Sequence, residues 1–199
     1  MTDSFIGNWN ISVTEDEKYL LYLAAWLHDI GCISDREHHN IASFQILLQD
    51  EGTCNSINYV NPSALMQLKY VINSHSSSYN IDSVPETMNG VRLKLICSIF
   101  RLLDACEICC TKCPKAVFKV IAPTLKDDPA AYSYWDGHMR IQSVVYKDPD
   151  ILILARDSNQ NSVNIVDRLR KEVDSITSIF LENGLHIPNI VVIDDSFVY

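Results

Sequence analysis

The chain has 199 residues, with 25 Asp or Glu against 16 Lys or Arg and a formal net charge of −9. Its apolar fraction of 47% suits a globular protein with a real core, and its length suits one good-sized domain or one domain with a small appendage. The acidic balance gives no strong signal for nucleic-acid binding, which needs a basic surface, and no apolar run approaches the roughly 20 residues of a membrane-spanning helix.

The cysteines and the N-terminus bear on the cellular compartment. The chain has seven cysteines, an odd number, and four of them lie within residues 106–113. Residues 1–4 lack the positive segment and apolar core of a secretory signal. A disulfide framework is therefore not expected, and a cytoplasmic location is predicted.

The first part of the chain predicts a series of helices. Residues 1–13 read as a loose lead-in, and Thr14 with Glu17 fits a capping box that opens a helix. This helix runs to about Ile30, where Gly31 ends it. Three more helices and two loops are predicted from apolar spacing and turn formers: helices at 37–49, 63–75 and 91–110, and loops at 54–61 and 76–85.

The pattern changes after Pro123 and the segment 127–129. The remaining elements are predicted as a strand at 139–146, a strand at 151–155, a turn at 157–161, a helix at 163–182 and a strand at 190–193. The predicted fold class is therefore mainly α. A helical domain over residues 1–128 precedes a small α/β appendage of β-β-α-β order over residues 129–199.

Three residues stand out as candidate metal ligands. His28 and Asp29 are adjacent at the end of an apolar helical run, and Asp104 lies in a second apolar helix. A metal ion needs several nitrogen or oxygen ligands that converge from separate elements. Burying an unpaired carboxylate is costly, and a shared ion satisfies both acids. This pattern predicts a divalent ion, for which imidazole and carboxylate ligands favour manganese, iron, nickel or zinc.

Three segments of the chain resemble the HD superfamily of metal-dependent phosphohydrolases, across about half its length. Residues 23–31 resemble the signature helix that ends in His-Asp, residues 36–43 the Arg-plus-His entry to the next helix, and residues 91–105 the late helix with the last aspartate. The HD-CE branch is the most similar, because Pro114 follows Arg-Leu-Leu-Asp-Ala at a short distance. The resemblance implies an HD-type helical bundle.

The resemblance also implies roles for residues outside the three ligands. His39 and His75 match places where some branches bind a second metal or contact the phosphate. Arg36 is the expected phosphate clamp, since its fork can contact two oxygens. Lys69 and Arg101 are further candidates for this contact.

One feature departs from the family pattern. The family's ligand set begins with a histidine on a helix before the His-Asp helix, and this chain has no histidine before His28. Either the chain is an N-terminally shortened version, or the site is built without that ligand. A water, His39 or His75 could take its place.

Each candidate also has a structural interpretation. His28 could be a helix C-terminal histidine stabilised by the helix dipole, and Asp104 could pair with Arg101 within its helix. His39 could belong to a solvated helix start, and His75 could simply end a helix. We expect His138 and His186 to be structural or surface residues.

A rival metal site is the cysteine cluster of Cys106, Cys109, Cys110 and Cys113. All four lie on one predicted helix, and a single helix cannot arrange four thiolates tetrahedrally around zinc. Buried cysteine also behaves as a small apolar residue. The cluster therefore remains the weaker candidate for a metal.

The sequence predicts a metal-dependent phosphohydrolase that acts on a nucleotide or other small phosphorylated metabolite, with a divalent ion to activate water. The alternative is a catalytically silent HD domain that binds a nucleotide or a partner protein. The HD-CE resemblance also implies attachment to a partner such as an ATPase module.

Overall fold

The computed structural model describes residues 2–9 and 11–194. They form two compact units, one within residues 1–104 together with 176–185, and the other within residues 105–175 together with 186–199. The first unit contains, in chain order, α1 (Thr2–Asn8), α2 (Glu15–Leu27), the 3-10 helix η1 (Ile30–Ile33), α3 (His39–Gln49), α4 (Glu51–Val60), α5 (Ala64–Ser74), the 3-10 helix η2 (Ile81–Ser83) and α6 (Leu93–Ala105).

The remaining elements are α7 (Lys115–Ile121), the 3-10 helix η3 (Ala122–Leu125), α8 (Pro129–Met139), β1 (Ile141–Lys147), β2 (Asp150–Ala155), α9 (Gln160–Glu182) and β3 (Asn189–Asp194). The last turns of α9, from residue 176, belong to the first unit. The predicted fold class is confirmed, since helices predominate and a small three-stranded sheet follows them. The domain boundary near residue 128 stays a prediction. Within the described ranges, no helix has both the length and the apolar content to cross a bilayer.

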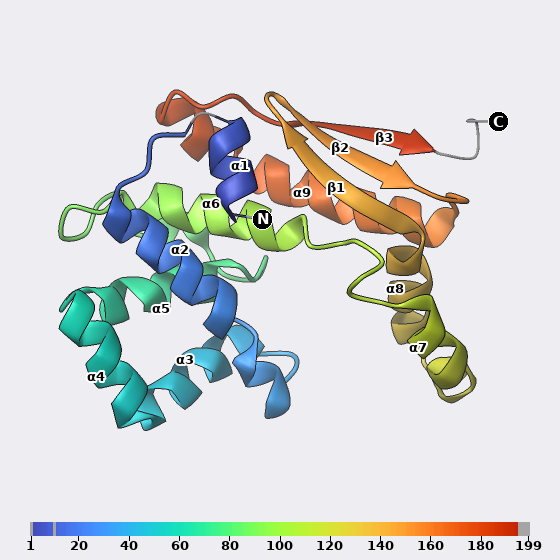
Figure 1. The fold of residues 1–199 in the computed structure, drawn as a ribbon, viewed down its shortest axis with the longest axis horizontal. Helices are drawn as coiled ribbons and strands as arrows, with labels where there is room; N and C mark the ends of the chain where they lie inside the picture. Colours follow the sequence, from blue (N-terminus) through green and yellow to red (C-terminus); the bar gives the residue numbers. More distant parts are fainter. Residues whose placement is uncertain (1, 10, 195–199) are drawn as a thin grey trace. The chain divides into compact units, whose positions relative to one another are not determined.

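Helix α6 forms the centre of the first unit. Ten of its thirteen residues are buried. A helix that is buried on nearly every side belongs inside a core, so α6 lies in the core of this unit. Among the other helices of this unit, α2 packs against α5, and α3 packs against both α5 and η1 (Figure 1). This packing sets the ends of several helices close to the last turn of α6.

A partly buried ion pair joins the start of α2 to the start of α6. The predicted capping box is confirmed: the Thr14 hydroxyl accepts from the Glu17 amide, and the Glu17 carboxylate accepts from the Thr14 amide. The Glu17 side chain, which is fully buried, also accepts hydrogen bonds from Arg92 Nε at 2.8 Å and Nη2 at 2.6 Å. One carboxylate thus caps a helix and neutralises an arginine.

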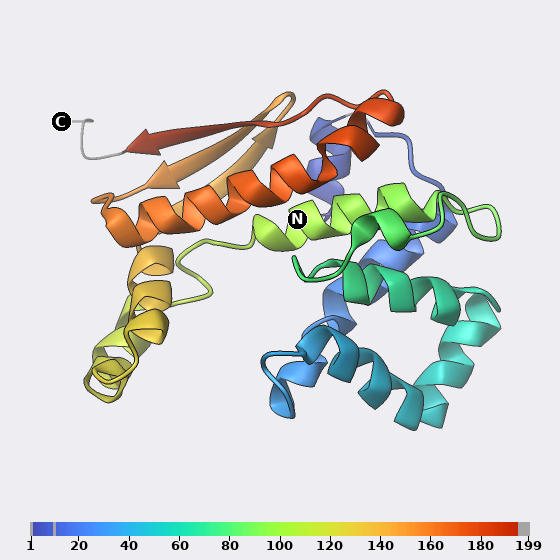
Figure 2. The ribbon, with the colours of Figure 1, turned by 180° about the vertical axis from the view of Figure 1, so that it is seen from behind.

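The sheet of the second unit is built around β2. This strand pairs antiparallel with β1 and parallel with β3. A parallel pair needs a crossover connection, which α9 supplies, and Figures 1 and 2 show its first part along the sheet. Alternate β2 residues Ile151, Ile153 and Ala155 are buried. The predicted β-β-α-β order is confirmed.

Two predicted loops are wrong because they form helices. Helix α1 lies in the expected lead-in, where Phe5 packs against Trp9 with tilted rings and Trp9 packs edge-on against Phe180 at 6.0 Å between ring centroids. These long-range contacts stabilise a helix too short to form alone. Helix α4 replaces the expected loop at 54–61. The Asp50 side chain caps its N-terminus, and Ile57, a residue of this helix, is buried.

The segment between α6 and β1 also differs from the prediction. The helix expected to reach residue 110 ends at Ala105, and the Cys110 amide donates instead to the Ile141 carbonyl at 2.7 Å. The expected boundary at 127–129 is a helix start. There the Asp128 carboxylate accepts from the Ala131 amide, and Pro129 occupies the first turn, where its missing N–H costs nothing.

The Glu17–Arg92 pair predicts a specific pH dependence of stability. Burial alone would raise the pKa of Glu17, but hydrogen bonds from Arg92 and from the Thr14 and Arg92 amides outweigh it and lower the pKa below 4.5. The ionised Glu17 therefore stabilises the fold fully above its unfolded-state pKa. This stabilisation is lost as the pH falls through its lowered folded-state pKa. We expect Glu17→Gln to lower the free energy of unfolding by about 3 kcal/mol at neutral pH and by less in acid.

Urea unfolding of both proteins across the acid range tests this expectation. A Glu17→Gln variant whose deficit stays constant from neutral pH to strongly acid pH would show that Glu17 is not ionised in the folded protein.

Candidate metal centre

His28 and Asp29 lie at the C-terminal end of α2. His28 caps the helix and is 9% exposed, and its Nδ1 lies 3.0 Å from the carbonyl oxygen of Ala24. A carbonyl oxygen only accepts, so this ring nitrogen carries a proton and donates it. The other ring nitrogen, Nε2, faces away from the helix backbone and lies 3.4 Å from the Asp29 carboxylate.

Asp104 approaches the same nitrogen from the last turn of α6. Its Oδ1 lies 3.3 Å from His28 Nε2, and its side chain is half-buried. His28 Nε2 is itself enclosed and forms no hydrogen bond of standard geometry within the described residues. The structure thus brings together His28, Asp29 and Asp104, while their binding of a metal stays a prediction.

His39 and His75 complete the cluster. His39 opens α3, and its Nδ1 donates to the Arg36 carbonyl at 2.9 Å, while His75 follows α5 and its Nδ1 donates to the Ile72 carbonyl at 2.5 Å. The two Nε2 atoms lie 2.8 Å apart. They lie 3.4 Å and 3.9 Å, respectively, from Asp29 Oδ1.

The three imidazoles share one hydrogen-bonding arrangement. In each ring the protonated Nδ1 donates to a backbone carbonyl, which leaves Nε2 to face the other rings and the carboxylates. The Nε2 lone pairs of His39 and His75 repel each other at 2.8 Å unless a proton or a cation lies between them. Metal-bound histidines in proteins almost always donate their second nitrogen in this way. The donor set therefore fits a divalent ion.

The electrostatics of the cluster favour a cation. Burial alone would lower the pKa of His28, but its contacts with Asp104 and Asp29 outweigh burial and raise this pKa to about 10. The contact with His28 in turn holds the pKa of Asp29 well below its usual range. Burial lowers the pKa of His75, which favours the neutral imidazole that binds metals.

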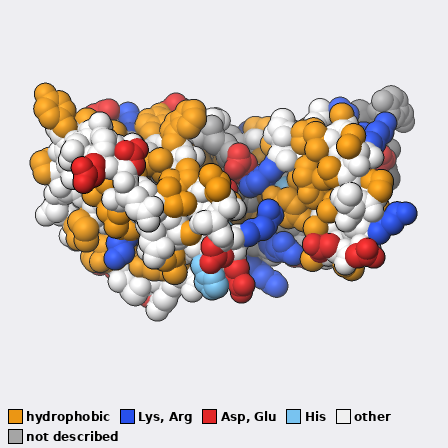
Figure 3. Space-filling model, turned by 90° about the horizontal axis from the view of Figure 1, so that it is seen from below, with side chains coloured by type: hydrophobic (Ala, Val, Ile, Leu, Met, Phe, Trp, Pro, Cys, Tyr) orange, Lys and Arg blue, Asp and Glu red, His pale blue; other side chains and the backbone are white. Residues whose placement is uncertain are grey.

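Helix dipoles add to this preference. The C-terminal ends of α2, α5 and α6 supply His28, His75 and Asp104, and each such end carries a partial negative charge. The face of the molecule in Figure 3 shows a histidine beside acidic side chains at the surface. His28 and His75 do lie at helix ends, as the structural interpretation expects. That interpretation does not explain why the Nε2 atoms of both rings face the carboxylates.

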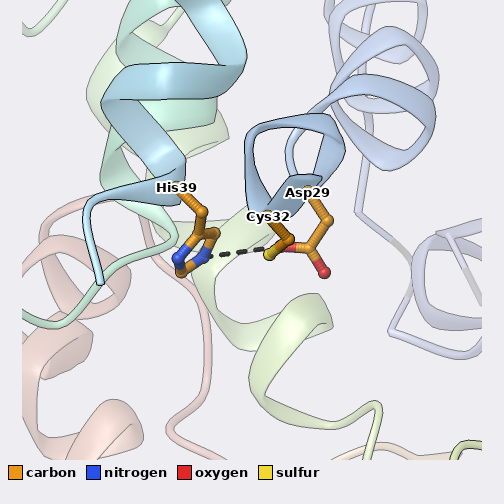
Figure 4. Close-up of side chains that lie close together, drawn as sticks. All are labelled: Asp29, Cys32 and His39. Carbon is orange, nitrogen blue, oxygen red and sulfur yellow. Dashed lines mark hydrogen bonds and ion pairs between the residues drawn. The ribbon is translucent and has the colours of Figure 1, made fainter. Parts of the chain in front are cut away.

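Cys32 joins the cluster, although the sequence pattern did not single it out. Donor atoms of Asp29, Cys32 and His39 all lie within 4.8 Å of one another, a group that could hold a metal ion (Figure 4). Asp29 caps η1 and Cys32 lies three residues further along this 3-10 helix, where side chains at i and i+3 eclipse each other. The Asp-x-x-Cys spacing is visible in the sequence, but it brings the two side chains together only in a 3-10 turn, which the sequence does not predict here.

Gly31 lets η1 approach α3 closely enough to form the cluster. A Cβ atom at this position would lie 2.2 Å from the His39 carbonyl oxygen and 2.4 Å from the Ser43 amide nitrogen. The Gly31 amide donates to the Ser43 hydroxyl at 2.8 Å, and that hydroxyl donates to the His28 carbonyl. This close contact connects the end of α2 to the start of α3.

The predicted phosphate-binding residues have different surroundings. Arg36 is exposed, and its carbonyl orients His39, so its side chain starts beside the cluster. Lys69 is also exposed. Arg101 is buried, and its guanidinium donates to the carbonyls of Ser74, the last residue of α5, and of Ser76 and Tyr79 beyond it. These contacts make Arg101 an anchor for the backbone that carries His75.

The cysteine cluster does not have the predicted setting. Because α6 ends at Ala105, the four cysteines at 106–113 lie outside helices, and the argument from helical spacing against zinc does not apply to them. Cys106 and Cys113 are buried, and burial raises the pKa of Cys113 to about 11, which disfavours the thiolate that metals bind. None of the four belongs to the donor group around Asp29.

No protein-family model matches the chain, and neither a curated protein nor a solved structure gives a match.

The close approach at Gly31 generates a prediction. Gly31→Ala forces the Cβ against backbone atoms of α3, so η1 must move away. We expect the free energy of unfolding to fall by about 1–3 kcal/mol, and the affinity for zinc to fall with it. Urea unfolding and zinc titration calorimetry measure the two effects.

Gly7→Ala is the matched control. Gly7 lies in α1, where an added Cβ meets nothing within 4 Å and alanine favours the helix. This variant should keep both stability and zinc affinity. Unchanged zinc binding in Gly31→Ala would exclude a role of this contact in shaping the cluster.

Proposed function

We propose that this chain is an HD-type metal-dependent phosphohydrolase that acts on a nucleotide or another small phosphorylated metabolite. One observation carries the proposal: three imidazoles, each oriented by a backbone carbonyl, converge with two carboxylates. The sequence resemblance supports it independently. The residues that match the family's His-Asp pair and last aspartate are His28, Asp29 and Asp104.

In this proposal each residue of the cluster has a role. His28, Asp29 and Asp104 hold a divalent ion of manganese, iron, nickel or zinc. When bound, such an ion lowers the pKa of a coordinated water and polarises a phosphoryl oxygen. His39 and His75 present Nε2 beside Asp29, where they can bind a second ion or contact the phosphate.

Arg36 is the proposed phosphate clamp. Its side chain is exposed, and within the described residues its guanidinium has no ion pair. A planar guanidinium can contact two phosphoryl oxygens at once, whereas Arg101 is already engaged by three carbonyls. In this proposal the exposed guanidinium of Arg36 binds a phosphate without giving up an ion pair within the described residues.

The second candidate function is a catalytically silent HD domain that binds a nucleotide or a partner protein. One specific observation favours it: the chain has no histidine before His28, while the family's ligand set begins with one. The two candidates differ in turnover and agree on metal or nucleotide binding.

The hydrolase proposal predicts metal-dependent turnover. After chelation, addition of manganese, iron, nickel or zinc should restore hydrolysis of a panel of nucleotides and small phosphomonoesters. Asp29→Asn and Asp104→Asn should each lower kcat/KM more than about a hundredfold, because they remove donors to the ion. Arg36→Ala should act mainly on KM. Phosphate release measures both the dependence on metal and the activity of the three variants.

Asp167→Asn is the control, since Asp167 is an exposed acid paired only with Arg170 in the described residues. It should retain full activity. Hydrolysis that survives chelation and both aspartate variants would contradict the proposal. Metal binding without turnover on any phosphoester would favour the silent domain.

A further inference from the structure

The two carboxylate oxygens of Asp29 face two different sets of donors. Oδ2 lies 3.4 Å from His28 Nε2, which also contacts Asp104. Oδ1 lies 3.4 Å from His39 Nε2, 3.9 Å from His75 Nε2 and 3.9 Å from Cys32 Sγ. The second set therefore combines two nitrogens, one oxygen and one sulfur.

The spacing of this second set suits a tetrahedral ion. Zinc binds nitrogen or oxygen at about 2.0–2.2 Å and sulfur at about 2.3 Å, which places neighbouring ligands about 3.3–3.7 Å apart. Three of the separations above, 3.4, 3.9 and 3.9 Å, lie close to this range. Among these four separations only that of His39 and His75, at 2.8 Å, is shorter than the range, by roughly half an ångström, and donor atoms of Asp29, Cys32 and His39 all lie within 4.8 Å of one another.

Packing gives no reason for a cysteine at position 32. All seven cysteines lie in the described residues, and Cys32 is the exposed one, whereas free cysteines are usually among the most buried side chains. Its thiol lies beside Asp29 because η1 eclipses side chains three residues apart. Cys32 is thus accessible to ions from solvent and already close to the other donors (Figure 4).

We propose that the Cys32 thiolate is a metal ligand, and that it binds together with Asp29, His39 and His75 a zinc-like cation distinct from the ion at His28 and Asp104. This proposal rests on the proposed metal binding at the cluster and adds a second ion with a soft ligand. A thiolate selects zinc, cobalt or ferrous iron over magnesium, calcium or manganese. Asp29 then bridges the two ions through its two oxygens.

Cobalt(II) is the probe, because a thiolate ligand gives it a charge-transfer absorption that imidazole and carboxylate ligands do not give. Titration of the metal-free full chain with cobalt(II) should produce this band together with the visible bands of a tetrahedral ion. Cys32→Ser should abolish the charge-transfer band, keep cobalt bound at the His28 side, and weaken zinc binding at the second site about 10–100-fold. Thermal unfolding of this exposed variant should match that of the unchanged chain.

Cys109→Ser is the matched control, since Cys109 belongs to the 106–113 cluster and makes its contact with Thr111. It should leave the band intact. Cobalt that binds without a charge-transfer band overturns the Cys32 proposal. A band that survives Cys32→Ser, or one that disappears in Cys109→Ser, overturns it as well. In each of these cases the hydrolase proposal still stands. Absence of any cobalt binding overturns both proposals.

Discussion

Three backbone carbonyl groups, those of Ala24, Arg36 and Ile72, fix the orientation of the imidazoles around Asp29. Each carbonyl accepts a hydrogen bond from one Nδ1–H group, so each Nε2 atom faces the shared space between the helices. Nitrogen lone pairs and carboxylates crowded in this way are unstable together without positive charge. Protons can supply it, as the raised pKa of His28 indicates, and a divalent ion supplies it more completely. The proposed chemistry depends on this requirement.

The fold meets the requirement by bringing helix ends together. α2, α5 and α6 present their C-terminal ends to the cluster, and α3 presents its first residue. Gly31 permits the contact between η1 and α3, and Arg101 holds the backbone after α5 through three hydrogen bonds. Neither residue needs to touch an ion. Gly31 lets η1, which follows Asp29, lie against the helix that begins with His39, and Arg101 binds the backbone on both sides of His75.

The sequence was informative where local pattern and tertiary structure agree. His28, Asp29 and Asp104 were recognisable because polar residues in apolar helices need a partner, and the structure brings them together. The capping box at Thr14 is likewise a local pattern. Helix α1 was not predictable, because it depends on contacts with Phe180 far along the chain. Cys32 was missed because its nearness to Asp29 depends on a 3-10 turn, and the four cysteines at 106–113 were misplaced because α6 ends earlier than its apolar pattern suggests.

The most direct test of the account is the protonation and metal binding of each histidine nitrogen, measured by ¹⁵N NMR of the imidazoles during zinc titration. We expect His28, His39 and His75 all to carry a proton on Nδ1 and their Nε2 resonances to shift to metal-bound positions. His138 is the internal reference, since its Nδ1 also donates to a carbonyl, that of Tyr134, and its Nε2 resonance should not respond to zinc. Nε2 resonances of the three rings that stay unchanged at saturating zinc, or rings protonated on Nε2 alone, would contradict the account.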